Sequence, residues 1–235
     1  MIKAIIFDFG QTLVDSANGF RTAEKVAKEK IFNTLLQGGK NINQAVFLDK
    51  YRSIRKLFHD ASIFSRVAIW KTVYDNFDYQ MEQPLLEQME IVYWDQIKQL
   101  TKPFPETLAV LEALTQRYQL GIISNTQGQK TEKNHRMALF PEIETFFATI
   151  IIAGESGIPP KPDSQSFELC LKQMKLKPSE AIYVGDDYRN DVCGSADAGL
   201  KPVWLQHRSV QRNWPEHKTT AFIIEDLREL LTIEY

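Results

Sequence analysis

The chain opens on a short, continuous apolar run that ends in a carboxylate. Residues 4–7 read Ala-Ile-Ile-Phe, and Asp8 follows directly. Such a run predicts a strand that is buried on both faces, as in a parallel sheet. Open α/β sheets bind their ligands at the carboxyl ends of the strands, which is where Asp8 lies. Asp8 is therefore a candidate for chemistry, although a role in capping a turn would explain the same position.

From residue 16 to residue 100 the apolar positions follow a helical period, and no strand candidate interrupts them. Four apolar stripes predict four helices. Asn18, Asn43 and Ser62 are the expected starts of the first three, and Pro84 suits the first turn of the fourth. The stripes are Phe20, Ala23, Ala27, Ile31 and Leu35; Phe47, Tyr51, Ile54 and Phe58; Ile63, Val67, Trp70, Tyr74 and Phe77; and Leu85, Met89, Val92 or Tyr93, Ile97 and Leu100.

Beyond residue 101 helices and strands alternate. The segment 102–105, Lys-Pro-Phe-Pro, predicts a hinge because its two prolines cannot continue a helix. The alternation predicts an α/β fold with a doubly wound, mostly parallel sheet. We assign residues 1–15 and 102–235 to this core and residues 16–101 to an inserted, all-helical cap. Strands are expected at 119–124, 148–153, 181–185, 202–205 and 222–224, and helices near 106–117, 130–139, 163–174, 191–198 and 225–231.

Composition and charge narrow the class of protein. The 235 residues are 43% hydrophobic and 25% charged, with a formal net charge of −2, which argues against a nucleic-acid partner. No apolar run reaches the roughly 18 residues of a membrane span, and the first residues lead straight into a strand, so we expect neither a membrane anchor nor a signal peptide. Cys170 and Cys193 are expected to be reduced and buried, which fits a cytoplasmic protein. The oligomeric state is left open.

Two further stretches carry side chains suited to an anion. Ser124 and Asn125 end an apolar strand and offer a hydroxyl and backbone amides to a phosphate oxygen, although a plain turn would look the same. Lys161 lies between Pro160 and Pro162, where it loses little entropy on pointing at one spot. A solvated loop lysine is the alternative interpretation. Asp163 is the expected N-cap of the helix that follows.

A third stretch concentrates carboxylates after the strand 181–185. Asp186, Asp187 and Asp191 lie within six residues of one another. Hard oxygen ligands at this density suit Mg²⁺, and without a cation they would repel one another.

Taken together, these stretches resemble the four motifs of the haloacid dehalogenase (HAD) superfamily of phosphotransferases. The first motif lies at Asp8, the second at Ser124, the third at Lys161 and the fourth at residues 186–191. The helical insert after the first motif is similar to that of the subfamily with a helical type-one cap. Each motif alone is weak, but the ordered set is specific.

The resemblance implies a role for each motif residue. Asp8 would attack phosphorus and form an aspartyl-phosphate that water hydrolyses. Mg²⁺ would be held by the Asp8 carboxylate, the carbonyl of Gly10 and Asp186. The substrate is expected to be a small phosphorylated metabolite.

The remaining motif residues would support this chemistry. Ser124, the amide of Asn125 and Lys161 would bind the phosphate. Asp191 would hold metal-bound water or orient Lys161, and Asp187 and Thr12 would support the same groups. The cap would close over the site and select the leaving group. Cap positions such as Arg21, Lys25 or Arg66 could face the site or the solvent, and the sequence does not reveal which.

Gly10 departs from the pattern of the family's phosphatases, which carry an Asp two residues after the nucleophile as the general acid and base. Loss of such a group costs on the order of 10²–10⁴ in rate. Three explanations compete. The substrate could need little protonation of its leaving group, as acyl and aryl phosphates do. Gln11 or a cap side chain could position the water. Or the protein could have become a phosphate-ester binding protein with vestigial catalysis.

The sequence therefore predicts a cytoplasmic, Mg²⁺-dependent hydrolase that works through Asp8. The rival of another class is a catalytically weak binding or regulatory protein on the same scaffold. A phosphonatase-type hydrolase with Lys50 as a Schiff base and a dehalogenase are further alternatives, although a dehalogenase would not need the carboxylates at 186–191.

Overall fold

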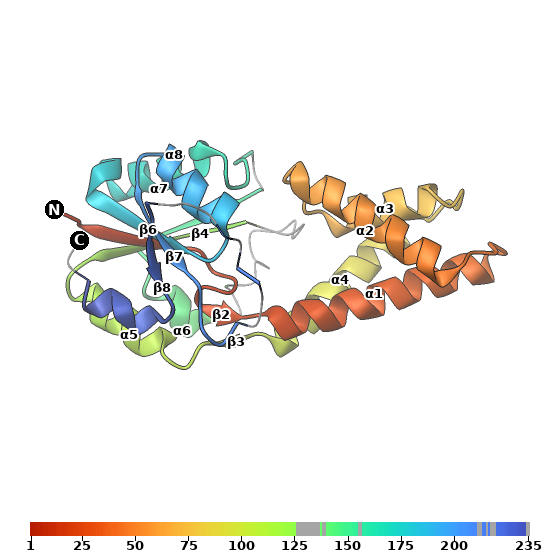
Figure 1. Ribbon diagram of the computed structural model, residues 1–235, viewed down its shortest axis with the longest axis horizontal. Helices are drawn as coiled ribbons and strands as arrows, with labels where there is room; N and C mark the ends of the chain where they lie inside the picture. Colours follow the sequence, from red (N-terminus) through yellow and green to blue (C-terminus); the bar gives the residue numbers. More distant parts are fainter. Residues whose placement is uncertain are drawn as a thin grey trace. The chain divides into compact units, whose positions relative to one another are not determined.

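The computed structural model describes residues 1–125, 137, 140–154, 157–210, 213–214, 216 and 220–233. These residues form two compact units (Figure 1). The core unit contains Met1–Asp15 and the described residues from Lys102 onward, and the helical unit spans Ser16–Thr101.

The core unit is built on a six-stranded sheet in the order β5-β4-β1-β6-β7-β8. Every pairing between these strands is parallel. The predicted doubly wound α/β core is therefore confirmed, and the first strand of the chain lies in the interior of the sheet between β4 and β6. The strands are β1 Ala4–Phe7, β4 Gln119–Asn125, β5 Thr149–Ala153, β6 Ala181–Gly185, β7 Lys201–Leu205 and β8 Phe222–Ile224.

Helices cover both faces of the sheet because successive residues of a strand point to opposite faces. Ile5 and Phe7 of β1 pack in one apolar cluster with helices α5 and α6 and the 3-10 helix η4, whereas Ala4 and Ile6 pack in another with α7. Figure 1 shows α5 and α6 on one side of the sheet and α7 and α8 on the other. These elements are α5 Thr107–Thr115, α6 Pro141–Glu144, α7 Ser164–Met174, α8 Gly194–Asp197 and η4 Leu227–Leu231.

A small second sheet lies in the core unit where the chain leaves it and returns. The strands β2 (Val14–Asp15) and β3 (Lys102–Pro103) pair antiparallel. The carbonyl of Leu13 accepts hydrogen bonds from the backbone N–H of Phe104 and, at 2.7 Å, from the Thr107 hydroxyl. Part of the expected hinge at 102–105 is therefore a β-strand paired with β2. The prolines of this segment do not predict that pairing.

The helical unit consists of α1 Ala17–Gln37, α2 Gln44–Asp60, α3 Arg66–Asp75 and α4 Gln83–Leu100. Its apolar core is separate from those of the core unit. All helices in the described part of the chain are too short or too polar to cross a lipid bilayer. The buried residues of this core are Ala23, Ala27, Ile31, Leu35, Phe47, Tyr51, Ile54, Val67, Ile69, Trp70, Val73, Tyr74, Leu86, Met89, Tyr93, Trp94 and Ile97.

Two predicted helix starts were wrong. Helix α1 already begins at Ala17, so Asn18 lies inside its first turn. Ser62 adopts a left-handed φ of 56°, and Ser65 is the N-cap of α3 instead. The prediction for α2 is confirmed, because the Asn43 side chain accepts a hydrogen bond from the backbone N–H of Ala45.

Some stripe residues also fall outside the helical core. Ile63, Leu85 and Val92 are exposed. In α4 the buried residues are Leu86 and Tyr93, which follow Leu85 and Val92 in the sequence. A stripe of apolar residues broader than the buried face does not reveal which of two adjacent positions points inward.

Four predictions for the core unit need correction or lie outside the description. The segment expected as a helix at 191–198 is a π-helix, η3 Tyr188–Cys193, followed by α8, and Cys193 is only half-buried. The last predicted helix starts at Leu227 rather than Glu225 and is a 3-10 helix. The sequence also did not predict the 3-10 helix η2 Pro178–Glu180 or α6. The expected helix at 130–139 lies outside the described residues, apart from Met137.

Gly19 marks a close contact between α1 and α4. A Cβ at this position would lie 2.9 Å from the carbonyl oxygen and 3.0 Å from the Cα of Ile97. A Gly→Ala change inside a helix normally stabilises it by up to about 1 kcal/mol. Here the added methyl meets backbone, so we expect Gly19→Ala to lower the free energy of unfolding by about 1–2 kcal/mol, measured by urea denaturation. Asn18→Ala changes the exposed neighbouring position and should stay within about 0.5 kcal/mol. A stabilised Gly19→Ala variant would contradict the tight contact.

Candidate functional site

The site forms at the carboxyl edge of the sheet, where three adjacent parallel strands end together. Asp8 follows β1, and its backbone N–H donates to the carbonyl of Val184 in β6 at 2.9 Å. Ser124 and Asn125 are the last residues of β4, and Asp186 follows β6. The parallel register therefore places residues from distant parts of the chain at one edge.

Three carboxylates gather at this edge. One oxygen from each of Asp8, Asp186 and Asp191 lies within 4.8 Å of the others. The side chain of Asp191 is 2% exposed, whereas that of Asp8 is 13% exposed, so Asp8 is more open to a substrate. Of the residues predicted to bind metal, Asp8 and Asp186 are in this cluster; Asp191 joins them, although it was expected only to support them.

The ammonium of Lys161 is buried against this cluster. Its Nζ donates to Asp8 Oδ1 at 2.8 Å, to Asp191 Oδ1 at 2.7 Å and to the Tyr183 hydroxyl at 2.7 Å. An ammonium has three protons, so these contacts occupy all of them. Lys161 therefore does not behave as the solvated loop lysine that the sequence allowed.

The charged groups of this cluster shift one another's pKa values. Burial alone would lower the pKa of Lys161, but the attraction of Asp191 and Asp8 raises it above its usual value. Burial raises the pKa of Asp191 to about 7 against the attraction of Lys161, and repulsion from Asp8 adds to the increase. Burial also raises the pKa of Tyr183 well above its usual value, so its hydroxyl is neutral.

Two residues that position Lys161 were missed or misassigned from the sequence. The Asn125 side chain accepts from the backbone N–H of Lys161 at 2.8 Å and donates to its carbonyl at 3.0 Å. The sequence assigned Asn125 only a backbone amide for phosphate. Tyr183 was read as part of an apolar strand, and its polar hydroxyl at a buried position was the signal that could have identified it.

The segment after β6 is shaped around Asp191. The Asp191 Oδ2 accepts from the backbone N–H of Asp187 at 2.9 Å. A Cβ on Gly185 would lie 2.4 Å from the Asp191 carboxyl carbon, so this position needs glycine. The Asp187 side chain instead accepts from the backbone N–H of Asn190 and caps the π-helix.

The donor set fits a divalent cation. Asp191 accepts from Lys161 and from the Asp187 N–H, and its Oδ1 lies 3.3 Å from the Tyr183 hydroxyl. Asp8 and Asp186 are the other two carboxylates of the cluster, and their oxygens could hold a metal. With one cation beside three carboxylates, the cluster carries excess negative charge that Mg²⁺ would balance with the oxygen ligands it prefers.

The turn after Asp8 brings the remaining residues of the first motif together. The Thr12 hydroxyl is 3.4 Å from Asp8 Oδ2, a long contact. Gly10 forms an isolated bridge with Val14, and Gln11 adopts a left-handed φ of 63°. The Gln11 side chain lies 3.4 Å from Asp15 Oδ1.

The specificity candidates of the helical unit fall into two groups. Arg66 is buried inside this unit: its Cζ lies 5.1 Å from the Tyr93 ring centre, and its backbone N–H bonds to Glu90. It therefore has a place in the core of the helical unit. Arg21 and Lys25 are exposed, and so is Lys50, the candidate for a Schiff-base lysine.

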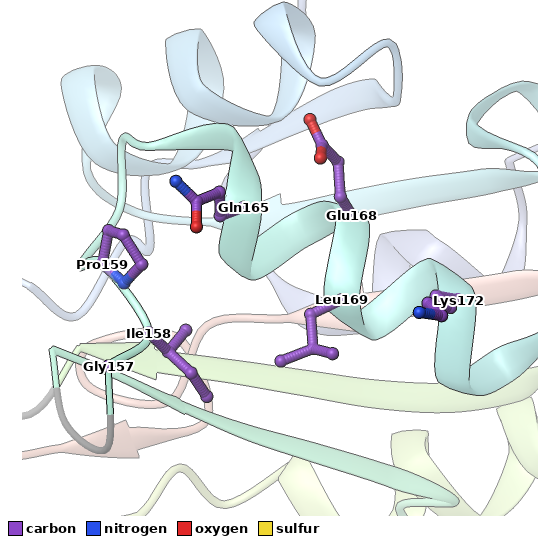
Figure 2. Close-up of a pocket in the computed structure, with 7 residues that line it drawn as sticks. All are labelled: Gly157, Ile158, Pro159, Gln165, Glu168, Leu169 and Lys172. Atoms are coloured by element: carbon purple, nitrogen blue, oxygen red, sulfur yellow. The ribbon is translucent and has the colours of Figure 1, made fainter.

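A separate open groove of about 300 Å³ lies along α7 in the core unit. Figure 2 shows Ile158 and Leu169 between the loop and the helix, with Glu168 pointing away. The groove includes neither Lys161 nor any of the three clustered carboxylates. Its lining residues are Gly157, Ile158, Pro159, Gln165, Glu168, Leu169 and Lys172.

Comparison with known proteins finds one family across most of the chain. Residues 2–199 match the haloacid dehalogenase-like hydrolases. The glyceraldehyde 3-phosphate phosphatase of Methanothermobacter thermautotrophicus is 30% identical over 99% of this chain and 100% of its own. The pyrophosphatase PpaX of Bacillus mycoides is 23% identical over 99% and 96%. The HAD hydrolase YfnB of Bacillus subtilis, solved with bound magnesium, has a similar fold, with a TM-score of 0.66, 19% identity and coverage of 98% and 97%.

The buried ion cluster predicts a large effect of removing its cation. Lys161→Met should lower the free energy of unfolding by about 3–5 kcal/mol, because the buried carboxylates lose their partner. Adding Asp191→Asn removes one of the repelling charges and should recover about 1 kcal/mol or more. Urea denaturation of the two single variants and the double variant, without divalent cations, measures this coupling. Additive losses would contradict a direct charge interaction between Lys161 and Asp191.

Proposed function

Because the chain belongs to the haloacid dehalogenase-like hydrolases, we propose that it is a Mg²⁺-dependent phosphatase of small phosphate esters that works through Asp8. One observation carries the proposal. Asp8 directly follows an interior strand, and its carboxylate accepts from the buried Lys161 ammonium and belongs to the cluster of three carboxylates. A turn-capping Asp would need none of these neighbours.

Asp8 is the proposed nucleophile. A carboxylate oxygen of Asp8 attacks phosphorus, the bond from phosphorus to the leaving oxygen breaks, and an aspartyl-phosphate forms. Water then attacks this phosphorus and releases phosphate. Asp8 Oδ1 accepts from Lys161 at 2.8 Å, whereas among the described residues the hydrogen bond of Oδ2 is the long contact to Thr12, so Oδ2 is the better placed attacking atom.

Lys161 is proposed to act on Asp8 rather than chiefly on the phosphate. Its three protons are already directed at Asp8, Asp191 and Tyr183, so a bond to a phosphate oxygen requires the exchange of one of them. Its positive charge would still offset the approach of an anionic substrate to a carboxylate. The Ser124 hydroxyl and the Asn125 amide would then bind the phosphoryl oxygens.

Mg²⁺ would be held by Asp8, Asp186 and the carbonyl of Gly10. When bound, it neutralises charge on the phosphoryl oxygens during transfer. The donor set described above supports this assignment, and the structural neighbour YfnB is magnesium-bound. Asp191 would keep Lys161 oriented.

The substrate is proposed to be a small phosphorylated metabolite or pyrophosphate. The named relatives hydrolyse glyceraldehyde 3-phosphate and, in the case of PpaX, pyrophosphate. The helical unit Ser16–Thr101 would be the cap that selects among such substrates. The cytoplasmic location stays a prediction from the sequence. The rival, a catalytically weak binding protein, rests on Gly10, which supplies no acid or base.

Removal of the nucleophile tests the enzyme. Asp8→Asn should abolish Mg²⁺-dependent hydrolysis of an aryl phosphate, of glyceraldehyde 3-phosphate and of pyrophosphate, because an amide does not attack phosphorus. Release of phosphate is measured with and without Mg²⁺. Asp197→Asn is the matched control, since Asp197 is exposed on α8. Wild-type activity that is no higher than that of Asp8→Asn would favour the binding protein.

Restoring a carboxylate tests the departure at Gly10. Gly10→Asp should raise the turnover of alkyl phosphates by about 10²-fold or more, because general acid catalysis matters most for a poor leaving group. Aryl phosphates should gain much less. Initial rates on an alkyl and an aryl phosphate, each compared with wild type, give the ratio. Equal gains on both substrates would show that leaving-group protonation does not limit this site.

A further inference from the structure

Trp204 lies beside the carboxylate cluster but is absent from the chemistry proposed above. It belongs to β7, where it pairs in register with Gly185 of β6, and it is 1% exposed. Its indole Nε1–H donates to the backbone carbonyl of Asp186 at 3.0 Å. A tryptophan buried to this extent needs a partner for its only polar group, and the Asp186 carbonyl is that partner.

The same peptide unit is held from its other side. The carbonyl of Asp186 and the N–H of Asp187 belong to one planar peptide group. Trp204 donates to the carbonyl, and Asp191 Oδ2 accepts from the N–H at 2.9 Å. Both polar groups of this peptide are thus taken by side chains from different elements. Since β6 fixes the backbone up to Gly185, these bonds set the direction in which the Asp186 Cα–Cβ bond leaves the backbone.

The indole is in turn fixed by aromatic neighbours. The Tyr188 ring lies 5.1 Å from that of Trp204 at an angle of 56°, and the Trp214 ring lies 6.3 Å away, edge to face. Tyr188 begins the π-helix that carries Asp191. The contact with Tyr188 therefore ties the strand β7 to the π-helix that carries Asp191, and the Nε1–H bond ties β7 to Asp186.

We propose that Trp204 is a positioning residue for Mg²⁺: it holds the Asp186 peptide so that the Asp186 carboxylate stays directed at the metal. This inference rests on the metal site of the proposed function. Groups that orient metal ligands from behind typically contribute 10–100-fold to metal affinity. The Nε1–H bond is the specific contact, and the ring serves to place it.

Trp204→Phe isolates this contact, since it keeps an aromatic ring and removes the donor. The carbonyl of Asp186 then loses its partner, and the peptide can rotate. We expect the dissociation constant for Mg²⁺ to rise about 10-fold. MgCl₂ alone is titrated against the full chain, and the constant is obtained from the increase in melting temperature with concentration. Trp214→Phe is the control: it makes the same substitution in the same aromatic cluster and leaves the bond to Asp186.

Each outcome decides the matter. The inference is supported if the dissociation constant for Mg²⁺ rises in Trp204→Phe and stays within about 2-fold of wild type in Trp214→Phe. The inference is overturned if the dissociation constants of Trp204→Phe and wild type are equal. It is also overturned if both variants lose the same affinity for Mg²⁺. Either result leaves the proposed function intact. A wild-type melting temperature that does not respond to Mg²⁺ overturns the metal site and this inference together. If Trp204→Phe does not fold, benzothienylalanine at position 204 removes the N–H while preserving the shape, and the same criteria apply.

Discussion

The site depends on the contact between the buried ammonium of Lys161 and two carboxylates. The ammonium is a cation placed against Asp8 and Asp191, with Tyr183 as its third partner. In a medium of low dielectric constant, carboxylates at this separation repel strongly, and each would be costly to bury without a counter-charge. The contact therefore does two things at once. It stabilises the convergence of β1, β6, the π-helix and the loop before α7, and in the proposed mechanism it would offset the negative charge of Asp8 when an anionic substrate approaches.

A second constraint is that side chains hold the backbone of the site. The Asn125 amide pairs with both backbone groups of Lys161, and Trp204 and Asp191 hold the two groups of the peptide after Asp186. Both segments lie outside regular strands, so their backbone groups lack ladder partners and must be paired otherwise. The pairing also fixes the direction of the side chains that they carry. Geometry of this kind is what a metal site and a nucleophile require.

Gly10 can supply a backbone carbonyl to the site but no side-chain acid or base. The proposed metal ligand at this position is a backbone carbonyl, which any residue supplies, whereas an acid or base must come from a side chain. Binding and phosphoryl transfer can therefore persist where protonation of the leaving group is weak. Such a site would favour substrates whose leaving group needs little protonation.

The sequence by itself determined the class of fold, the succession of helices and strands along the chain, and the residues that follow the strands. Short continuous apolar runs such as 4–7 are typical of strands buried inside a parallel sheet, and polar residues at their carboxyl ends mark its ligand-binding edge. The helical stripes located four helices, but Asn18 and Ser62 were chosen wrongly as helix starts. Several polar residues near each boundary can cap, and only packing of the helices selects among them.

The tertiary structure alone decided which side chains touch. Tyr183 and Trp204 look like ordinary core residues in their strands, and Asn125 looks like the end of a turn. Their polar atoms acquire partners only when parallel pairing brings β4, β6 and β7 into register and the loop at Lys161 folds back over their ends. Contacts between residues 22 to 36 positions apart, such as Lys161 with Tyr183 and Asn125, leave no trace in local periodicity. The sequence could thus place the charges at one edge, but only the fold determined how they are paired.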